Sequence, residues 1–231
     1  MKYLKQLDSN LWIYDGSTVS WYTMPYTTRM TVVRLDDGKI WIHSPEKILD
    51  GLINEIRELG EVEYIISPNK IHHLFIQDWA KVFPDAKTYA APGLKEKRND
   101  VNFYGELEDY SEIEWKDEID QLIFKGSRVM DEVVFFHKKS RTLILTDLIE
   151  NFSPNHFTGV KKILAVFTGI VSPNGKMPLD WRLSFFRGKQ EARKSLEKMV
   201  NWSPVRIIIS HGECIDKNAV SFLLKSFSWV R

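Results

Sequence analysis

Short apolar runs alternate with polar turns along the chain, and their spacing predicts strands and helices in mixed order. Runs rich in β-branched and aromatic residues predict strands, which in the first half lie at 11–14, 30–35, 39–43, 61–66 and 87–90. Apolar residues spaced three and four apart predict helices at 46–59 and 74–83. Ser44 is the expected N-cap of the first helix, and Gly60 is its expected terminator.

The second half of the chain repeats this order of strands followed by helices. Strands are predicted at 121–124, 132–136, 142–145 and 205–210, with a terminal helix at 217–229. Residues 156–200 are expected to form a helical region of two or three segments, and the polar stretch 99–116 a loop. Strand–helix–strand order is typical of an α/β sheet with helices on its faces. We therefore expect an α/β fold in one domain, 1–231.

Composition then excludes several classes of function. The 231 residues are 43 % hydrophobic and 27 % charged, as in ordinary soluble globular proteins. The net charge of +1 predicts no general attraction to nucleic acid or to anionic lipid. The longest apolar stretch, 163–171, is far shorter than the roughly 18 residues of a membrane span, and the N-terminus lacks the apolar run of a signal peptide. Cys214 is the only cysteine, which favours a reducing, cytoplasmic location.

Four polar side chains lie just beyond the ends of three predicted strands. They are His72, His73, Asp147 and His211. Because loops at the carboxyl ends of strands converge on one cleft in open α/β sheets, these side chains are candidates for one shared site. Imidazole and carboxylate ligands suit Zn²⁺, and Fe²⁺ or Mn²⁺ also accept this mixed set. The sequence therefore predicts a site for one divalent metal.

The alternative is that the same residues have only structural roles. His72 and His73 also suit the partly exposed start of a helix, and Asp147 suits the cap of a following turn. Under this alternative the histidines are hydrogen-bonded polar residues in a cleft that binds no metal.

Other candidates are weaker. Glu132 opens a predicted strand, and it either approaches the same cleft or forms a salt bridge with a nearby arginine. His43 is expected behind the site, either in the core or as a support for a ligand. Trp181 and Arg182 would suit a pocket for an anionic or planar ligand, although a packed tryptophan beside a surface arginine is the favoured explanation.

The turn around the paired histidines carries a family resemblance. Residues 65–75 read I-I-S-P-N-K-I-H-H-L-F. This turn resembles the H-x-H-x-D-H motif that follows an apolar strand in the metallo-β-lactamase superfamily, whose fold is a four-layer αββα sandwich. An ungapped match places Pro68 and Lys70 on the first two histidines of that motif, His72 on its aspartate and His73 on its last histidine. The order of elements resembles this superfamily over nearly the whole chain.

Three further stretches extend the resemblance. Asp147 in L-I-L-T-D-L resembles the metal-bridging aspartate of the superfamily, and His211 in I-I-I-S-H-G resembles its final metal-binding histidine. The H-S-P at 43–45 stands where the superfamily often has D-T-G. Together with E-V-V-F-F-H-K-K-S-R-T-L-I-L-T-D at 132–147, it is similar to an uncharacterised branch found in bacteria and plants.

The resemblance implies a site that has kept one metal of two. Pro68 and Lys70 would remove two ligands of the family's three-histidine site, so one divalent metal is expected, zinc with iron or manganese as alternatives. Its expected ligands are His72, His73, Asp147 and His211. Such a hydrolase would act through metal-bound water on an ester, thioester or phosphoester of an unidentified small molecule. Asp147 and Lys70 would be catalytic, Asp147 orienting the water and Lys70 stabilising an oxyanion.

The second hypothesis is a non-catalytic binding or scaffold protein that keeps the fold without the metal. Aromatic residues make up 13 % of the chain, and several gather in the early strands and the loop between them. They are Trp12, Trp21, Tyr22, Tyr26 and Trp41. Such side chains either cover an apolar ligand or partner, including a second copy in a homodimer, or thicken the core.

Overall fold

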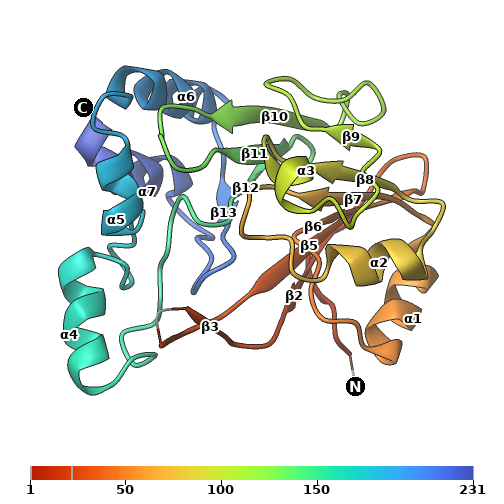
Figure 1. Cartoon of the computed structure of the whole chain (residues 1–231), viewed down its shortest axis with the longest axis horizontal. Helices are drawn as coiled ribbons and strands as arrows, with labels where there is room; N and C mark the ends of the chain where they lie inside the picture. The colour runs from red at the N-terminus through yellow and green to blue at the C-terminus, as the bar shows by residue number, and fades with distance from the viewer. Residues whose placement is uncertain (1, 22, 231) are drawn as a thin grey trace.

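Two β-sheets pack face to face and carry helices on their outer surfaces, as Figure 1 shows for the computed structural model, which describes residues 2–21 and 23–230. The larger sheet contains, in spatial order, β1 (Lys5–Asp8), β2 (Leu11–Asp15), β5 (Arg29–Arg34), β6 (Ile40–His43), β7 (Val62–Ser67), β8 (Lys87–Ala90) and β9 (Gly105–Glu106). The smaller sheet contains β10 (Ile119–Phe124), β11 (Glu132–His137), β12 (Thr142–Ile144) and β13 (Arg206–Ile208). A separate antiparallel pair is formed by β3 (Val19–Trp21) and β4 (Met24–Tyr26).

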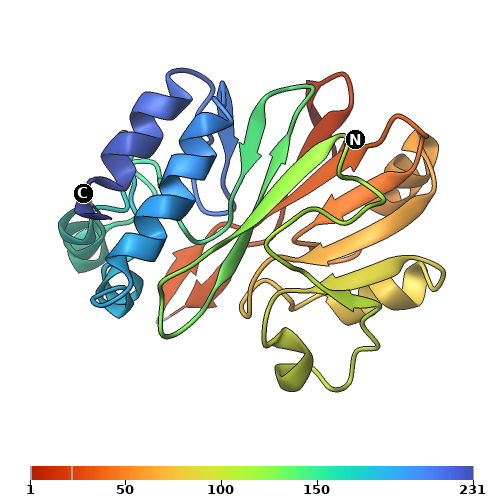
Figure 2. The same cartoon turned by 90° about the horizontal axis from the view of Figure 1, so that it is seen from above.

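Helices cover the outer face of each sheet. Those of the first half are α1 (Asp50–Leu59), α2 (Ile76–Val82) and α3 (Leu94–Lys97). Those of the second half are α4 (Gly159–Thr168), α5 (Leu179–Ser184), α6 (Lys189–Asn201), α7 (Ala219–Ser226) and a closing 3₁₀ turn, Ser228–Val230. Seen from above, the molecule has helices, sheet, sheet and helices in turn (Figure 2), which is the αββα sandwich that the family resemblance implied. Within the described residues, no helix has both the length and the apolar content to cross a membrane.

Apolar side chains fill each of the three gaps between these layers. Between the sheets, Trp41 and Tyr64 from the larger sheet belong to one buried cluster with Phe135 from the smaller sheet. The buried face of α1 packs on the outer side of the larger sheet through Leu52, Ile53 and Ile56, which are spaced three and four apart as one helical face requires. A third cluster joins α6 and α7 to the smaller sheet. This packing fixes both sheets, and hence the strand ends that carry the candidate site.

Most elements predicted from the sequence are present. Each predicted strand exists with shifts of a few residues at its ends, and the helical region 156–200 contains α4, α5 and α6. The sequence missed β1, β3 and β4, and it missed the short β9 within the expected loop 99–116. Among the aromatic residues assigned to the early loop, Tyr22 and the side chain of Trp21 lie outside the described part of the chain.

The predicted N-cap of the first helix is wrong. The helix begins at Asp50, its N-cap position is Leu49, and no side chain caps it. Ser44 instead has a φ of 53° and donates its backbone N–H to the carbonyl of Ile66, which extends the parallel pairing of β6 with β7 by one residue. A residue held in the sheet in this way cannot start the helix, and its hydroxyl is free for another partner.

Candidate metal centre

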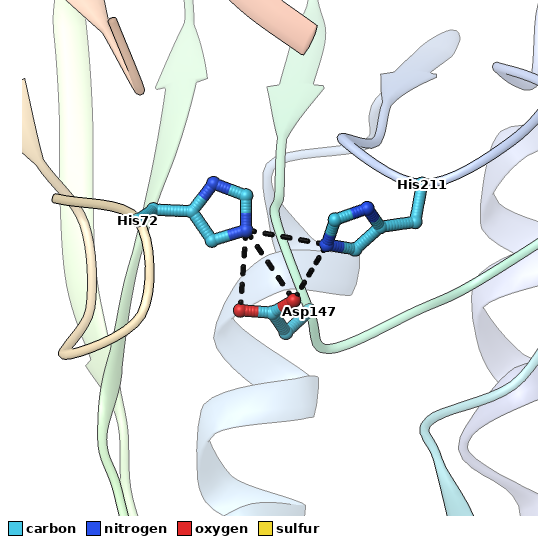
Figure 3. Close-up of side chains that lie close together, drawn as sticks. All are labelled: His72, Asp147 and His211. Carbon is cyan, nitrogen blue, oxygen red and sulfur yellow. Dashed lines mark hydrogen bonds and ion pairs between the residues drawn. The ribbon is translucent and has the colours of Figure 1, made fainter. Parts of the chain in front are cut away.

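The ends of three strands deliver three side chains to one point. The turn after β7 carries His72, the segment after β12 carries Asp147, and the segment after β13 carries His211. Figure 3 shows the two imidazoles facing each other across the Asp147 carboxylate, and one ligand atom from each residue lies within 4.8 Å of the others. Because β12 and β13 are parallel neighbours, Asp147 and His211 leave the same edge of the smaller sheet. The sheet arrangement therefore explains why residues so far apart in sequence meet.

The spacing of these atoms fits a tetrahedral ion. Metal–ligand bonds of 2.0–2.1 Å imply ligand–ligand distances of about 3.3–3.4 Å at tetrahedral angles. The distance from His72 Nε2 to His211 Nε2 is 3.3 Å, and that from His72 Nε2 to Asp147 Oδ1 is also 3.3 Å. The distance from His211 Nε2 to Asp147 Oδ1 is 2.8 Å, which is the length of a hydrogen bond. Small shifts of one side chain would accommodate an ion among all three.

Both imidazoles are oriented through their other ring nitrogen. His211 Nδ1 donates to the carbonyl oxygen of Thr27 at 2.6 Å, because a carbonyl can only accept. His72 Nδ1 shares a hydrogen bond of 2.7 Å with Ser44 Oγ, the residue expected to cap the helix. Each bond turns Nε2 toward Asp147. Metal-binding histidines in proteins are held by such partners, which fix both the tautomer and the direction of the ring.

Burial makes the charges of this cluster interdependent. The side chains of His72, Asp147 and His211 are only 7 %, 10 % and 6 % exposed. Burial alone would raise the pKa of Asp147, but the charge of His72 and the hydrogen bonds from both imidazoles outweigh it and hold that pKa below its usual range. Burial alone would lower the pKa of His211, but its hydrogen bond and ion pair with Asp147 raise it to about 9. In the metal-free protein at neutral pH, His211 therefore carries a proton directed at Asp147.

Glu132 holds the backbone of the Asp147 segment. This carboxylate is fully buried at the start of β11 and accepts the backbone N–H groups of Thr146 and Asp147, both at 2.8 Å. Burial, followed by the charge of Asp147, raises the pKa of Glu132 to about 7. The sequence left two roles open for Glu132, an approach to the cleft or a salt bridge with an arginine. Glu132 lies beside the cluster, and the salt bridges found among the described residues do not include it.

Asn69 joins the histidine turn to the aspartate, and sequence reasoning missed it. Its side-chain oxygen accepts the backbone N–H groups of Ile71 and His72 at 2.8 and 2.9 Å. Its amide nitrogen donates to Asp147 Oδ2 at 2.6 Å and to Thr146 Oγ1 at 2.9 Å. The only signal was the Ser-Pro-Asn turn, since Asn often bonds the backbone two or three residues further along.

Residues at and just before the start of β5 hold the turn that carries His211 by hydrogen bonds. The buried Arg29 guanidinium donates through Nη1 to the carbonyl oxygens of Ile209 and Gly212, on either side of His211. Thr27 Oγ1 accepts the backbone N–H of Gly212 at 2.9 Å, while its carbonyl accepts from His211. Arg29 at the start of β5 and Thr27 two residues before it thus hold both the backbone and the imidazole.

Two residues predicted for the site lie outside the cluster. His73 turns away from it, because adjacent side chains in this tight turn point in different directions, and its Nδ1 accepts from Arg98 Nη1 at 2.8 Å. Burial, with Lys97 and Arg98 nearby, lowers the pKa of His73 to about 4. The Lys70 ammonium packs over Gly93, and within the described chain no hydrogen bond or ion pair joins it to the cluster. We therefore leave His73 out of the ligand set, and the predicted catalytic role of Lys70 has no contact with the cluster to support it.

The remaining candidates have packing roles. His43 is 1 % exposed and stacks on Trp41 with ring centres 5.7 Å apart, as expected for a core histidine. Trp181 is buried and donates to Ser127 Oγ, and Arg182 donates to the carbonyl of Thr168. Trp181 is therefore packed as the sequence allowed, whereas Arg182 is half-buried and not the surface residue that was expected.

The early aromatic residues divide between the core and the site. Trp12 and Trp41 are buried in the core. Tyr26 packs edge-on against His211 with ring centres 5.1 Å apart, and its hydroxyl donates to Glu150 Oε2 at 3.1 Å. Burial raises the pKa of Glu150 to about 8, so that this carboxyl adds little negative charge beside His211 at neutral pH.

Comparisons with known proteins agree with this architecture. Residues 8–160 match the family described as Domain of unknown function (DUF4336). A comparison with curated proteins finds no match. The DIM-1 metallo-β-lactamase exposed to ceftazidime has a TM-score of 0.67 at 16 % identity, covering 99 % of this chain and 97 % of that one.

Two further solved structures resemble the chain. The metallo-β-lactamase from Pontibacter korlensis has a TM-score of 0.62 at 12 % identity, covering 97 % of this chain and 98 % of its own. The metallo-β-lactamase FIM-1 from Pseudomonas aeruginosa, in its mono-zinc form, has a TM-score of 0.65 at 9 % identity, covering 98 % and 94 %. At such identities the likeness establishes the fold alone. The chain belongs to the DUF4336 family of domains of unknown function, and it has the metallo-β-lactamase fold.

Proposed function

We propose that this protein is a mononuclear metal-dependent hydrolase whose ligands are His72, Asp147 and His211. The observation that carries the proposal is the pair of Nε2 atoms turned toward one carboxylate, each imidazole being held by a partner on its Nδ1. Two histidines and one carboxylate form a known catalytic zinc set, and non-haem iron accepts the same set. Zinc is the first expectation, since FIM-1, which shares the fold, was crystallised with a single zinc.

A divalent metal held there would lower the pKa of a bound water to about 7 and polarise an ester, thioester or phosphoester. Asp147 directs Oδ1 toward both imidazoles, while Asn69 holds Oδ2 by a hydrogen bond. In this proposal Asp147 orients the nucleophile or accepts its proton. Glu132 keeps the backbone of Asp147 in place, so the carboxylate does not need to reorganise during the reaction.

Metal analysis of untagged protein tests the ligand set. The purified chain is stripped with a chelator, reloaded separately with Zn²⁺, Fe²⁺ or Mn²⁺, and desalted before elemental analysis. We expect one metal per chain in the parent and a loss of stoichiometric metal in His72→Ala and His211→Ala. His73→Ala is the matched control, because His73 bonds Arg98 and lies outside the cluster. A parent that retains no metal, or a control that loses it equally, contradicts the proposal.

The scaffold hypothesis has one observation in its favour. The His211–Asp147 ion pair satisfies both groups without any metal, so the cluster can exist as a purely structural feature. Hydrolysis of ester, thioester and phosphoester substrates by the metal-loaded protein separates the two hypotheses. Activity that is lost in both His72→Ala and His211→Ala supports the enzyme, and metal-independent stability with no turnover supports the scaffold.

A further inference from the structure

Helix α4 leaves almost its entire surface in solvent. Of its ten residues, Gly159–Thr168, only Ala165 is buried. Five of the exposed residues have large apolar side chains: Val160, Ile163, Leu164, Val166 and Phe167, with exposures between 50 % and 80 %. Isolated exposed apolar residues are common in soluble proteins, but a contiguous group on one helix marks an interaction surface.

The apolar side chains form a stripe directed away from the molecule. Val160, Ile163, Leu164 and Phe167 are spaced i, i+3, i+4 and i+7, which places them on one side of an α-helix. At 100° per residue, Ala165 falls on roughly the opposite side, and it packs with Phe152 and Phe157. Figure 1 shows α4 at the lower left edge of the molecule.

The neighbouring helix adds to this surface. Arg182 of α5 donates to the carbonyl of Thr168 at the end of α4, so the two helices meet there. Leu183 on α5 is 68 % exposed, and Phe186 just beyond it is 78 % exposed. We call the exposed apolar residues of α4 together with Leu183 and Phe186 the α4–α5 surface.

Charge around the α4–α5 surface is strongly one-sided. Residues 157–190 contain six Lys or Arg and a single acid, Asp180. The basic residues are Lys161, Lys162, Lys176, Arg182, Arg187 and Lys189. The rest of the chain contains twenty-six basic and thirty acidic residues, so the net charge of +1 hides this local excess. Two copies meeting through this surface would bring like charges together, whereas an anionic lipid surface would attract it.

We propose that the α4–α5 surface binds the face of a bilayer that contains anionic lipids. The apolar stripe enters the boundary between headgroups and acyl chains, while the basic residues contact the headgroups. A ten-residue helix is about 15 Å long, which suits a position in the plane of the interface and not across the bilayer. This inference is independent of any metal or hydrolysis.

Vesicle flotation of the full chain tests the proposal. The parent is mixed with vesicles of phosphatidylcholine alone and with vesicles of phosphatidylcholine and phosphatidylserine, at low and high salt. We expect binding to the anionic vesicles that falls as salt rises, because the Debye length shortens. The variant Ile163→Gln/Phe167→Gln removes two stripe residues while keeping good helix formers. Arg187→Glu reverses an exposed charge next to Phe186.

The matched control is Ile113→Gln, since Ile113 is 74 % exposed and lies outside the surface, against 69 % for Ile163. Each stripe residue removed is expected to lower the partition coefficient about tenfold. Arg187→Glu should lower it by a similar factor. The Ile113→Gln control should leave it unchanged. Circular dichroism and thermal melting confirm that every variant is folded.

Three results would overturn the proposal. The first is a parent that floats with neither vesicle or equally with both. The second is an Ile113→Gln control that loses as much binding as Ile163→Gln/Phe167→Gln. The third is a parent that forms a dimer in light scattering and binds no vesicles, together with a double variant that is a monomer. That result would make the surface a contact between two copies of the chain.

Discussion

Replacing Asn69 by alanine tests whether this buried side chain orients His72 and Asp147 in the candidate metal site. The side chain is fully buried, its amide oxygen accepts two hydrogen bonds, and its amide nitrogen donates to three acceptors, the third being Glu132 Oε2 at 3.2 Å. Its oxygen fixes the turn that carries His72, and its nitrogen fixes one oxygen of Asp147. Alanine removes all five bonds and leaves the Asp147 carboxylate oxygen without this donor.

The size of the effect follows from those bonds. Each neutral hydrogen bond contributes about 1 kcal/mol net, and the bond to the Asp147 carboxylate about 1.5–3 kcal/mol. Because water can enter the space and effects at one residue are not additive, we expect a loss of about 3–5 kcal/mol in the free energy of unfolding. A small domain with a stability of about 5–15 kcal/mol can remain folded after such a loss. Metal affinity should fall about 10–100-fold, as for other residues that orient ligands.

Two measurements separate these effects for Asn69→Ala. Urea unfolding in the presence of a chelator gives the loss in the free energy of unfolding. Competition with a chromophoric chelator in the absence of urea gives the metal affinity. Asn54→Ala is the control, because Asn54 is exposed on α1 and its removal should change stability by less than about 0.5 kcal/mol. An Asn69→Ala protein that is destabilised but binds metal as tightly as the parent would refute the orienting role.

Three further predictions concern the surroundings of the cluster. Burial lowers the pKa of His43 to about 3 from an unfolded value near 6.5, so its contribution to stability is complete above pH 6.5 and declines as pH falls. When the pH is lowered from 7.5 to 5, the free energy of unfolding of the parent, measured in urea, should therefore fall by about 2 kcal/mol more than that of His43→Leu. Equal decreases in the two proteins would show that His43 is not the group responsible. In Glu132→Gln, an amide NH₂ group would face a backbone N–H that now donates a hydrogen bond to Glu132, so the Asp147 segment should shift. Chelator competition should then show at least about a tenfold loss of metal affinity. Arg29→Lys loses the forked contact around His211, and the melting temperature should fall by about 4–8 °C, with no change if the guanidinium contacts are unimportant.

Local patterns in the sequence predicted an α/β fold and the location of the cluster, whereas the αββα arrangement of the layers was implied by the family resemblance. Apolar periodicity identified the strands, and the position of Asp147 and His211 just beyond two of them was enough to bring them together. The choice between His72 and His73 could not be made in this way. It depends on which side chain the turn directs inward, and that direction is set by Asn69, which accepts the N–H of His72 from within the turn.

Partners distant in sequence were also beyond prediction. Ser44 has the residue type and the position of an N-cap, since it precedes a proline and a helical pattern. It serves the cluster instead because β6 pairs with β7, which holds its backbone beside Ile66 and places its hydroxyl against His72 Nδ1. A local propensity was outweighed by sheet pairing that only the folded chain reveals.

The histidine at position 72 explains how one cluster suits both a metal and its absence. Where the resembling motif has an aspartate, a second carboxylate would stand beside Asp147, and without a cation the two would repel each other in a buried site. With an imidazole there, the metal-free cluster contains one carboxylate and two rings, and a proton on His211 neutralises the carboxylate. A metal ion must displace that proton, so metal affinity in this cluster has to weaken as pH falls below about 9. If His72 is a metal ligand, the same imidazole also allows a neutralised metal-free cluster, and we expect protons to compete with the metal for His211.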